Sequence, residues 1–332
     1  MKILSVVIPM YNTEKGCFKK CLKSLECSRV EDIELIVVDD GSKEENSIVI
    51  KNLVEESKLD SFYFRKENGG QNSARLYGMK KATGKYIFFV DADDYLETKY
   101  LDDILQLLIE KNPSILAFNY DVRTPDGKII EEHERWKSDY QSMDVTKGIL
   151  NSDSLCLQIY NLQVLRDNKI ELAQGIRIGE DFASAITILA TIEQAYTVGG
   201  CLYHYIKYPG STLSNPPLGS ELDIVKAFDF ILKNLDTQKK KAFHQELEWL
   251  AILHVLYYGT ERIMMFFSGN RNDITKIQTW INHKFPHWKN NYYLKILPMA
   301  KKLEFKMVIN GWILPIEIYR GIKILIKKML KN

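Results

Sequence analysis

Four short apolar runs near the start of the chain each end in a polar loop that contains Gly, Asp or Asn. The runs cover residues 3–8, 33–38, 62–65 and 86–90. Their length and their β-branched and aromatic residues are typical of buried strands, and helical segments separate them. This alternation predicts an α/β fold with a doubly wound, mostly parallel sheet.

The polar loops are expected to face one cleft. The carboxyl ends of parallel strands meet at one edge of a sheet, and ligands bind in the crevice beyond that edge in open α/β folds. The loops hold, in chain order, Tyr11 and Asn12, then Asp39 and Asp40, then Asn68, Gly69 and Gly70, then Asp91 and Asp93.

The fourth loop, Asp91-Ala92-Asp93-Asp94, has three carboxylates in four residues. In extended chain Asp91 and Asp93 lie on the same side. Their hard oxygens suit Mg²⁺ or Mn²⁺, which usually binds together with a phosphate ligand. Acidic loops also occur as simple strand caps. The metal interpretation is favoured because three other polar loops are expected at the same cleft. The sequence predicts a divalent metal and a phosphate-bearing substrate.

Two other loops have both structural and functional interpretations. Asp39-Asp40-Gly41-Ser42 has the residue types of an Asx turn, and one carboxylate, Asp40 by preference, could instead bind a base or ribose. Gly69 and Gly70 precede a helix, where they form either a flexible turn or an anion site. Arg75 in that helix could pair with a phosphate or with a surface acid.

Downstream, Glu180-Asp181 opens an amphipathic helix. Acids at a helix start stabilise its dipole, but Asp181 could also serve as a general base for an incoming hydroxyl. His204 is either a buried, hydrogen-bonded histidine or a group that reaches the metal or pyrophosphate. Lys207, Ser211 and Thr212 could bind phosphate oxygens or belong to an ordinary loop.

The ordered motifs resemble those of inverting family-2 glycosyltransferases of GT-A fold. Residues 3–95 carry this resemblance through SVVIPMYN, LIVVDDGS, ENGGQNSAR and GKYIFFVDADD. Further on, GIRIGEDF resembles the Glu-Asp base motif of that family. YHYIKYPGSTLS is similar to the segment that follows it in bacterial cell-surface polysaccharide enzymes. The resemblance covers about residues 1–215.

The resemblance implies a nucleoside-diphosphate sugar donor, expected to be UDP-linked, and a glycan or lipid-linked acceptor hydroxyl. It implies a role in capsule, cell-wall or other surface polysaccharide synthesis. Asp181 would be the base, assisted by Glu180. Asp93 and Asp91 would hold Mn²⁺ or Mg²⁺, with His204 as an additional candidate ligand. The implied donor-binding residues are Pro9, Tyr11, Asn12, Asp40, Asn68, Arg75, Asp91 and Ala92, with Lys207, Ser211 and Thr212 near the pyrophosphate.

Alternative functions remain at this point. A sugar-nucleotide nucleotidyltransferase would need a Gly-rich phosphate loop after the first strand, where this chain has Pro9-Met-Tyr-Asn. A phosphotransferase with an aspartyl nucleophile would need an Asp at the end of residues 3–8. A catalytically silent sugar-nucleotide-binding or scaffold module also stays open.

The composition divides the chain. Asn215-Pro216-Pro217 marks a boundary, so we expect a catalytic domain over residues 1–215 and a helical region over 220–332. That region could make acceptor, homo-oligomer or membrane-surface contacts. The net charge is +2, and we expect no nucleic-acid partner. From Lys301 onward the sequence has eight Lys or Arg residues and only two glutamates. This excess of positive charge suggests contact with an anionic membrane surface.

Localisation follows from the cysteines and from apolar run lengths. The five cysteines are odd in number and lack CxxC spacing, as expected of reduced thiols. No apolar run approaches the roughly 18 residues of a membrane span, and we expect no signal peptide. We therefore expect a cytoplasmic protein, either soluble or on the inner face of the membrane.

Overall fold

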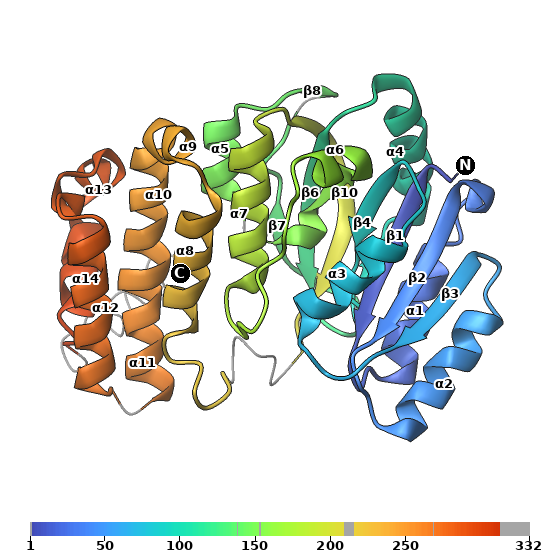
Figure 1. Cartoon of the computed structure of the whole chain (residues 1–332), viewed down its shortest axis with the longest axis horizontal. Helices are drawn as coiled ribbons and strands as arrows, with labels where there is room; N and C mark the ends of the chain where they lie inside the picture. Colours follow the sequence, from blue (N-terminus) through green and yellow to red (C-terminus); the bar gives the residue numbers. More distant parts are fainter. Residues whose placement is uncertain (1, 138, 153, 209–215, 268, 313–332) are drawn as a thin grey trace, which may run out of the picture. The chain divides into compact units, whose positions relative to one another are not determined.

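The computed structural model describes residues 2–137, 139–152, 154–208, 216–267 and 269–312. These residues fall into two compact units, Met1–Gly175 with Glu180–Ser211, and Ile176–Gly179 with Thr212–Asn332. The first unit is α/β and the second is helical (Figure 1). The expected fold class, GT-A-like α/β followed by a helical region, is confirmed. The functional boundary between residues 215 and 220 stays a prediction.

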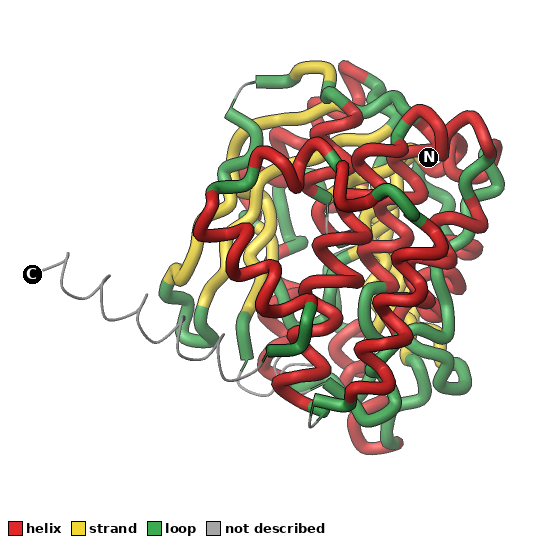
Figure 2. Tube along the Cα trace, turned by 90° about the vertical axis from the view of Figure 1, so that its left-hand side faces the viewer, coloured by secondary structure: helices red, strands yellow, loops and turns green. Residues whose placement is uncertain are grey.

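The first unit is built on one sheet with strand order β3-β2-β1-β4-β9-β6-β10-β5. Off this path, β7 pairs with β6 and β8 pairs with β10. Figure 2 shows these strands as one curled sheet. The strands are β1 Leu4–Met10, β2 Ile33–Asp39, β3 Asp60–Arg65, β4 Tyr86–Phe89, β5 Tyr95–Leu96, β6 Ile115–Arg123, β7 Ile129–His133, β8 Gln141–Ser142, β9 Gln158–Asn161 and β10 Tyr196–Ile206.

The sheet is mixed. Strands β3, β2, β1 and β4 are parallel, whereas β9 runs antiparallel to both β4 and β6. All seven residues of β1 and of β2 are buried, as expected of central strands covered on both faces. Met10 pairs with Asp39 and Asp39 with Arg65, so three strands end at one level and bring their loops together.

Helices cover both faces of this sheet. Apolar residues of α1, α2 and α4 share one core cluster with alternate residues of β1 and β2, whereas α3 packs on the other face (Figure 1). The helices of this unit are α1 Lys15–Ser24, α2 Glu44–Glu55, α3 Gln71–Lys81, α4 Thr98–Lys111, α5 Val145–Asn151, α6 Leu162–Asp167 and α7 Glu180–Ile192, with 3₁₀ turns at Val30–Asp32 and Leu155–Leu157.

Residues 131–153 are polar and give little local signal for a strand or helix, yet they include regular structure. The segment contains the end of β7, the short strand β8 and helix α5. β7 is an exposed edge strand with charged residues, so it lacks the apolar alternation that reveals a strand. Helix α5 is short and is capped by Asp144, whose carboxylate accepts from the backbone N–H of Thr146.

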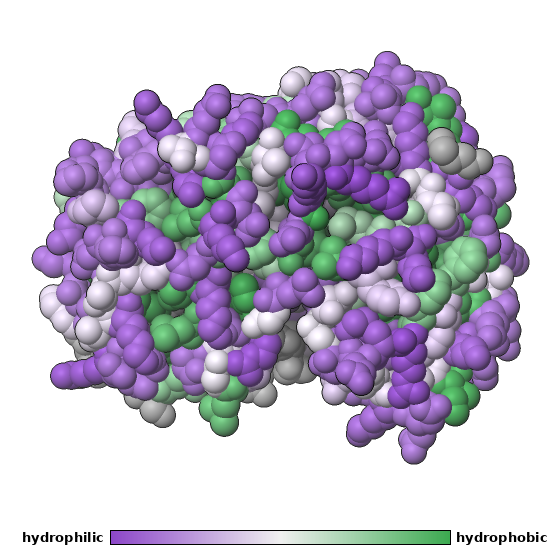
Figure 3. All heavy atoms as spheres, in the orientation of Figure 1, coloured by the Kyte–Doolittle hydropathy of each residue, from purple (hydrophilic) through white to green (hydrophobic). Residues whose placement is uncertain are grey.

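The second unit is helical among its described residues. Figure 3 shows one face of the whole chain, on which hydrophilic side chains predominate and small apolar patches lie between them. No helix in the described part of the chain is long and apolar enough to cross a membrane. The helices are α8 Asp223–Asn234, α9 Thr237–Ala242, α10 His244–Leu250, a π-helix Ala251–Gly259, α11 Thr260–Phe266, α12 Arg271–Lys284, a 3₁₀ turn Trp288–Asn290, α13 Tyr292–Ile296 and α14 Met299–Ile309.

Candidate functional site

The two carboxylates that end β2 have different surroundings. Asp39 is fully buried and accepts hydrogen bonds from the Ser42 N–H at 2.8 Å, the Tyr63 hydroxyl at 2.6 Å and the Ser47 hydroxyl. Burial alone would raise the pKa of Asp39, but these donors lower it below its ordinary value. Asp39 therefore stabilises the end of β2 through these hydrogen bonds. Asp40 is the carboxylate that can interact with the adjoining loop.

Asp40 fixes the turn that leads into α3. Its carboxylate accepts from the Lys66 ammonium at 2.7 Å and from the N–H groups of Gly69 at 3.0 Å and Gly70 at 2.7 Å. Gly70 has φ of 89°, a conformation that favours glycine. The predicted contact of Asp40 with a nucleobase stays a prediction. In the structure Asp40 shapes the third loop, where Asn68 is exposed.

The loop after β1 lies against the loop after β2. Asn12 adopts a positive φ of 50°, its N–H donates to the Ser42 hydroxyl at 2.8 Å, and its side-chain oxygen accepts from the Lys43 N–H at 2.9 Å. Tyr11 beside it is 57% exposed, whereas Pro9 is buried within β1. Tyr11 thus offers an aromatic face to solvent next to the Asp40 loop.

Arg75 joins two acidic elements of the site. Its side chain in α3 is fully buried. One terminal nitrogen donates to Asp91 Oδ1 at 2.6 Å, and the other donates to Asp181 and to Asn72 Oδ1 at 2.9 Å. The residue after β4 and the residue at the start of α7 therefore share one guanidinium, although ninety positions separate them in the chain.

Asn72 positions the start of α7. Its side-chain amide donates to the Glu180 carbonyl at 3.2 Å and to the Ser184 hydroxyl at 3.1 Å. These bonds tie the first turn of α7 to α3 and so place Asp181 opposite Arg75. The second carboxylate oxygen of Asp181 accepts from the Ser154 hydroxyl at 3.3 Å.

The two acids that open α7 hold protons more tightly than ordinary carboxyls. Burial and the neighbouring charge of Asp181 raise the pKa of Glu180 to about 7. Burial also raises the pKa of Asp181, with a contribution from Asp91, while Arg75 opposes the rise. A carboxylate of raised basicity in a half-buried site can accept a proton from a bound hydroxyl.

Tyr203 holds the acidic loop after β4. Its hydroxyl accepts from the Asp91 N–H at 3.2 Å and donates to Asp94 Oδ2 at 2.6 Å, while the Ile206 N–H donates to Asp94 Oδ1 at 2.7 Å. Asp94 is 1% exposed, so it anchors the loop to β10. Gln71 adds a hydrogen bond to Asp91 Oδ1 at 2.8 Å.

Asp93 is the carboxylate of this loop that is open to a ligand. Its side chain is exposed, and no hydrogen bond or ion pair joins its carboxylate to another side chain within the described ranges. Protein atoms nevertheless crowd the group, and this desolvation, together with the charge of Asp91, raises the pKa of Asp93 to about 6. A divalent cation would offset that repulsion, so Asp91 and Asp93 fit a hard metal ion.

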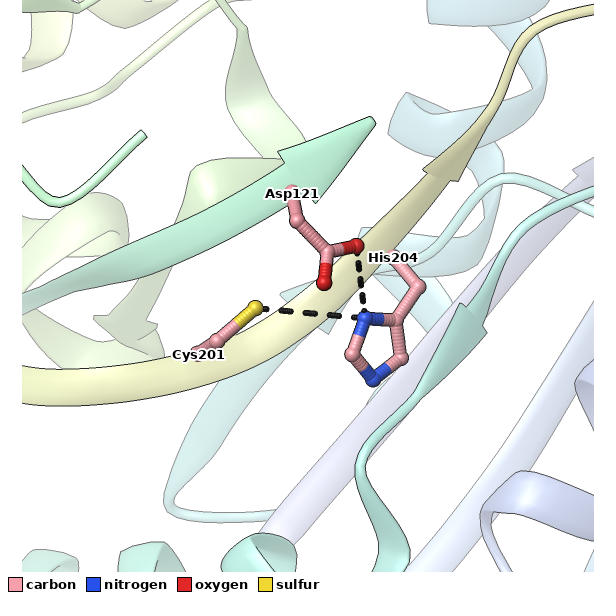
Figure 4. A group of neighbouring side chains, drawn as sticks. All are labelled: Asp121, Cys201 and His204. Carbon is pink, nitrogen blue, oxygen red and sulfur yellow. Dashed lines mark hydrogen bonds and ion pairs between the residues drawn. The ribbon is translucent and has the colours of Figure 1, made fainter. Parts of the chain in front are cut away.

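His204 belongs to a separate cluster with Asp121 and Cys201, on β6 and β10 (Figure 4). Its Nδ1 is 2.8 Å from Asp121 Oδ1 and 3.9 Å from Cys201 Sγ. The Arg123 guanidinium bonds both oxygens of Asp121, at 3.0 Å or less, which leaves that carboxylate poorly available to a cation. The metal role of His204 stays a prediction.

The remaining pyrophosphate candidates are only partly described. Lys207 is exposed just after β10, and Ser211 and Thr212 lie outside the described residues. The sequence-based interpretation also missed several positioning residues. Tyr203, Gln71, Asn72 and Ser154 gave no local signal, because their partners are far away in sequence or on another element.

Comparison with known proteins identifies the fold and the domain. Residues 5–167 match the model of glycosyl transferase family 2. The crystal structure of S. aureus TarS 1-349 in complex with UDP superposes with a TM-score of 0.71 at 18% identity, over 97% of this chain and 92% of that one. The complex of TarS 1-349 with UDP-GlcNAc gives a TM-score of 0.68 at 19% identity, with the same coverage. At such identities the likeness concerns the fold.

Similarity to curated sequences is local. Glycosyltransferase GlyA of Streptococcus pneumoniae is 34% identical over 35% of this chain and 16% of its own length. An uncharacterized glycosyltransferase of Haemophilus influenzae is 32% identical over 36% of this chain and 48% of its own length. The minor teichoic acid biosynthesis protein GgaB of Bacillus subtilis is 28% identical over 63% of this chain and 23% of its own length. The chain thus spans less than half of each of these relatives.

Fold and site together define a GT-A-like α/β domain with a helical region. Within that domain, residues 5–167 are of glycosyl transferase family 2.

Proposed function

We propose that the protein is an inverting glycosyltransferase that moves a sugar from a nucleoside-diphosphate sugar to a hydroxyl of a glycan or lipid-linked acceptor. The observation that carries the proposal is the shared guanidinium of Arg75. It holds Asp91, at the expected donor-phosphate side, and Asp181, the expected base, within one site. UDP is the favoured nucleotide because structural neighbours were crystallised with UDP and UDP-GlcNAc. Similarity to GgaB supports a role in the synthesis of a cell-surface polymer.

The proposed reaction is a single displacement. Asp181 removes the proton of the acceptor hydroxyl, whose oxygen bonds to the anomeric carbon as the bond from that carbon to the diphosphate oxygen breaks. The electron pair of the broken bond leaves with the nucleoside diphosphate. Attack on the face opposite the leaving group inverts the anomeric centre. Arg75 keeps Asp181 oriented, and Glu180 beside it adjusts the basicity of the pair.

A divalent ion, Mn²⁺ or Mg²⁺, is proposed to bind at Asp93 and Asp91, where it would neutralise charge on the leaving diphosphate. The donor set supports this assignment because Asp93 is exposed, its pKa is raised and Asp91 is its charged neighbour. We expect exhaustive chelation to abolish transfer and added Mn²⁺ or Mg²⁺ to restore it. Full activity in the chelated protein would remove the metal role of these two residues.

Turnover tests the proposal directly. Purified full-length protein is screened with a panel of nucleotide sugars for release of nucleoside diphosphate, first alone and then with candidate acceptors. The anomeric configuration of the product is read by NMR. In single-turnover experiments we expect Asp181→Asn to slow transfer by about 10²-fold or more, since general-base catalysis contributes roughly this much. Asp167→Asn, at the end of α6, is the matched control and should leave the rate unchanged.

The competing functions give different results in the same screen. A silent binding or scaffold module would bind nucleotide sugars without turnover and would be indifferent to Asp181→Asn. A nucleotidyltransferase would release no nucleoside diphosphate in this screen, and would instead release pyrophosphate when given a nucleoside triphosphate and a sugar phosphate. Transfer that is unchanged in Asp181→Asn would exclude the proposed base.

A further inference from the structure

The helical unit contains a pocket of about 600 Å³ between α8, α9, α10 and the end of α12. Its apolar wall is formed by Leu232, Leu247 and Phe285, of which Leu247 and Phe285 are buried. Lys233, Lys240 and Lys284 line the polar side. The pocket therefore combines apolar surface with three ammonium groups contributed by three separate helices.

Two of these three lysines are not neutralised. Lys284 pairs with Asp229 at 3.1 Å, and Asp229 also accepts from the Trp280 indole N–H at 3.0 Å. Lys233 and Lys240 have no ion-pair partner among the described residues. Asp229 is the only carboxylate that lines the pocket among the described residues, so the lining keeps an excess of positive charge.

His244 extends the polar side of the pocket. Its ring meets Phe285 edge-on, with centroids 6.1 Å apart and an interplanar angle of 73°. Phe285 in turn packs edge-on against Trp280 at 6.2 Å. These aromatic contacts give the pocket a packed wall, and the imidazole adds an N–H donor beside the lysines.

An anion with several oxygen acceptors is the ligand that matches this lining. Lysine binds phosphate as a point charge with three donors, and burial of the apolar part of a ligand against Leu247 and Phe285 would weaken competition from water. The volume is within the range of small-ligand pockets and exceeds the needs of one phosphate group. It leaves room for the sugar, alditol or prenyl group that carries the phosphate.

We propose that this pocket binds a phosphate group of the acceptor. The proposal rests on the proposed glycosyltransferase function, because it assigns the pocket to the second substrate of that reaction. The phosphate could belong to a polymer linked by phosphodiesters or to a prenyl diphosphate carrier. In both cases Lys233 and Lys240 would pair with phosphate oxygens, while the sugar hydroxyl that reacts lies elsewhere on the acceptor.

Binding to the full-length protein tests the proposal. Calorimetry is performed with a short glycerol-phosphate oligomer and, separately, with a soluble short-chain prenyl diphosphate, both with saturating UDP so that the donor site is occupied. At least one probe should bind wild-type protein. Lys233→Ala/Lys240→Ala should weaken that binding by about 10-fold or more, since two charge-assisted contacts are lost. The probe that binds distinguishes a polymer from a lipid-linked acceptor.

The matched control is Lys19→Ala/Lys111→Ala, which removes the same charge from exposed positions on α1 and α4. It should alter binding less than about twofold if long-range charge is screened by salt. Equal weakening by both double variants, or no binding of either probe to wild-type protein, would overturn the proposal. So would a loss of binding to anionic vesicles with unchanged binding of the soluble probes, since the lysines would then contact a membrane.

Donor hydrolysis separates this proposal from the proposed function. Lys233→Ala/Lys240→Ala should release nucleoside diphosphate from the donor at the wild-type rate without acceptor, and its KM for acceptor should rise. If wild-type protein turns over no nucleotide sugar, the proposed function fails, whereas the calorimetric result still decides whether the pocket binds phosphate.

Discussion

Arg75 is a buried cation, and its charge is neutralised by two carboxylates of the candidate site. Removing a guanidinium from water costs several kcal/mol, and here Asp91 and Asp181 together offset that cost. Deleting Arg75 would leave two carboxylates without their cation. Its replacement would therefore alter folding and chemistry together, and neighbouring residues offer cleaner tests of the site.

The raised pKa of Glu180 and Asp181 predicts the acid side of the pH–rate profile. The base works as a carboxylate, so activity should fall as pH drops through the raised pKa, at higher pH than for ordinary carboxyls near 4. With saturating substrates, kcat measured from pH 5 to 8 should rise through an inflection. Glu180→Gln should remove any inflection near pH 7. A plateau already complete at pH 5 would contradict the prediction.

Tyr203 is predicted to position the acidic loop. Tyr203→Phe removes the hydroxyl that bonds both the Asp91 N–H and Asp94. Because Asp91 and Asp93 are assigned to the donor side, we expect KM for the nucleotide sugar to rise about 10-fold with a smaller effect on kcat. Steady-state kinetics measure this split. Tyr205→Phe is the control because Tyr205 makes no hydrogen bond to another described side chain, and an equal effect there would argue against a specific role of Tyr203.

At the level of elements, α3 does most to assemble the site. It begins after Gly70 and lies directly on β1. Its Gln71 and Arg75 both bond Asp91, Arg75 also bonds Asp181, and Asn72 bonds Ser184. Asp40 caps the turn before it through the N–H groups of Gly69 and Gly70. The distance between helix and sheet thus sets where Arg75 meets the two carboxylates.

Gly78 permits that close approach. A Cβ atom at this position would lie 2.4 Å from Val7 Cγ1, a contact with a stiff β-branched side chain. Although alanine favours helix more than glycine, we expect Gly78→Ala to lower the free energy of unfolding by about 1–3 kcal/mol through overpacking. Chemical denaturation measures it. Lys80→Ala on the exposed side of α3 should change stability by less than about 0.5 kcal/mol, and a Gly78→Ala protein as stable as wild type would contradict the packing argument.

At the level of the whole molecule, α13 and α14 support the proposed contact with anionic membranes. From Lys284 to Trp312 there are six lysines and one acid, Glu304, which is 5% exposed. The same helices expose apolar side chains, among them Ile296 at 59%, Met299 at 80% and Leu303 at 50%. Lysines and exposed apolar groups on short helices are typical of binding at a bilayer surface.

Vesicle flotation of the full-length protein tests this contact. We expect binding to anionic but not to neutral vesicles, and weaker binding as salt is raised. Met299→Glu/Leu303→Glu should reduce binding by about 10-fold or more, because burying such a side chain contributes about 1.5–3 kcal/mol. Leu218→Glu, at a residue 83% exposed elsewhere in the helical unit, is the control. Undiminished binding of the α14 variant would exclude this surface.

The strands of the parallel half, and the order of the loops that follow them, could be predicted from the amino-acid sequence. Apolar runs of strand length and the glycines and acids that end them are local signals, so β1 to β4, α3 and the start of α7 could be predicted. The exposed edge strand β7 could not, because its neighbours rather than its own residues make it a strand.

The contacts of each polar residue could not be predicted in this way and are known from the folded structure. That structure placed Asp39 in a buried hydrogen-bond network and Asp94 under Tyr203, left Asp93 exposed, and joined His204 to Asp121. The physical reason is that burial and charge pairing arise between elements far apart in sequence. Carboxylates with the same local pattern therefore acquire different partners, and different pKa values, only when the chain has folded.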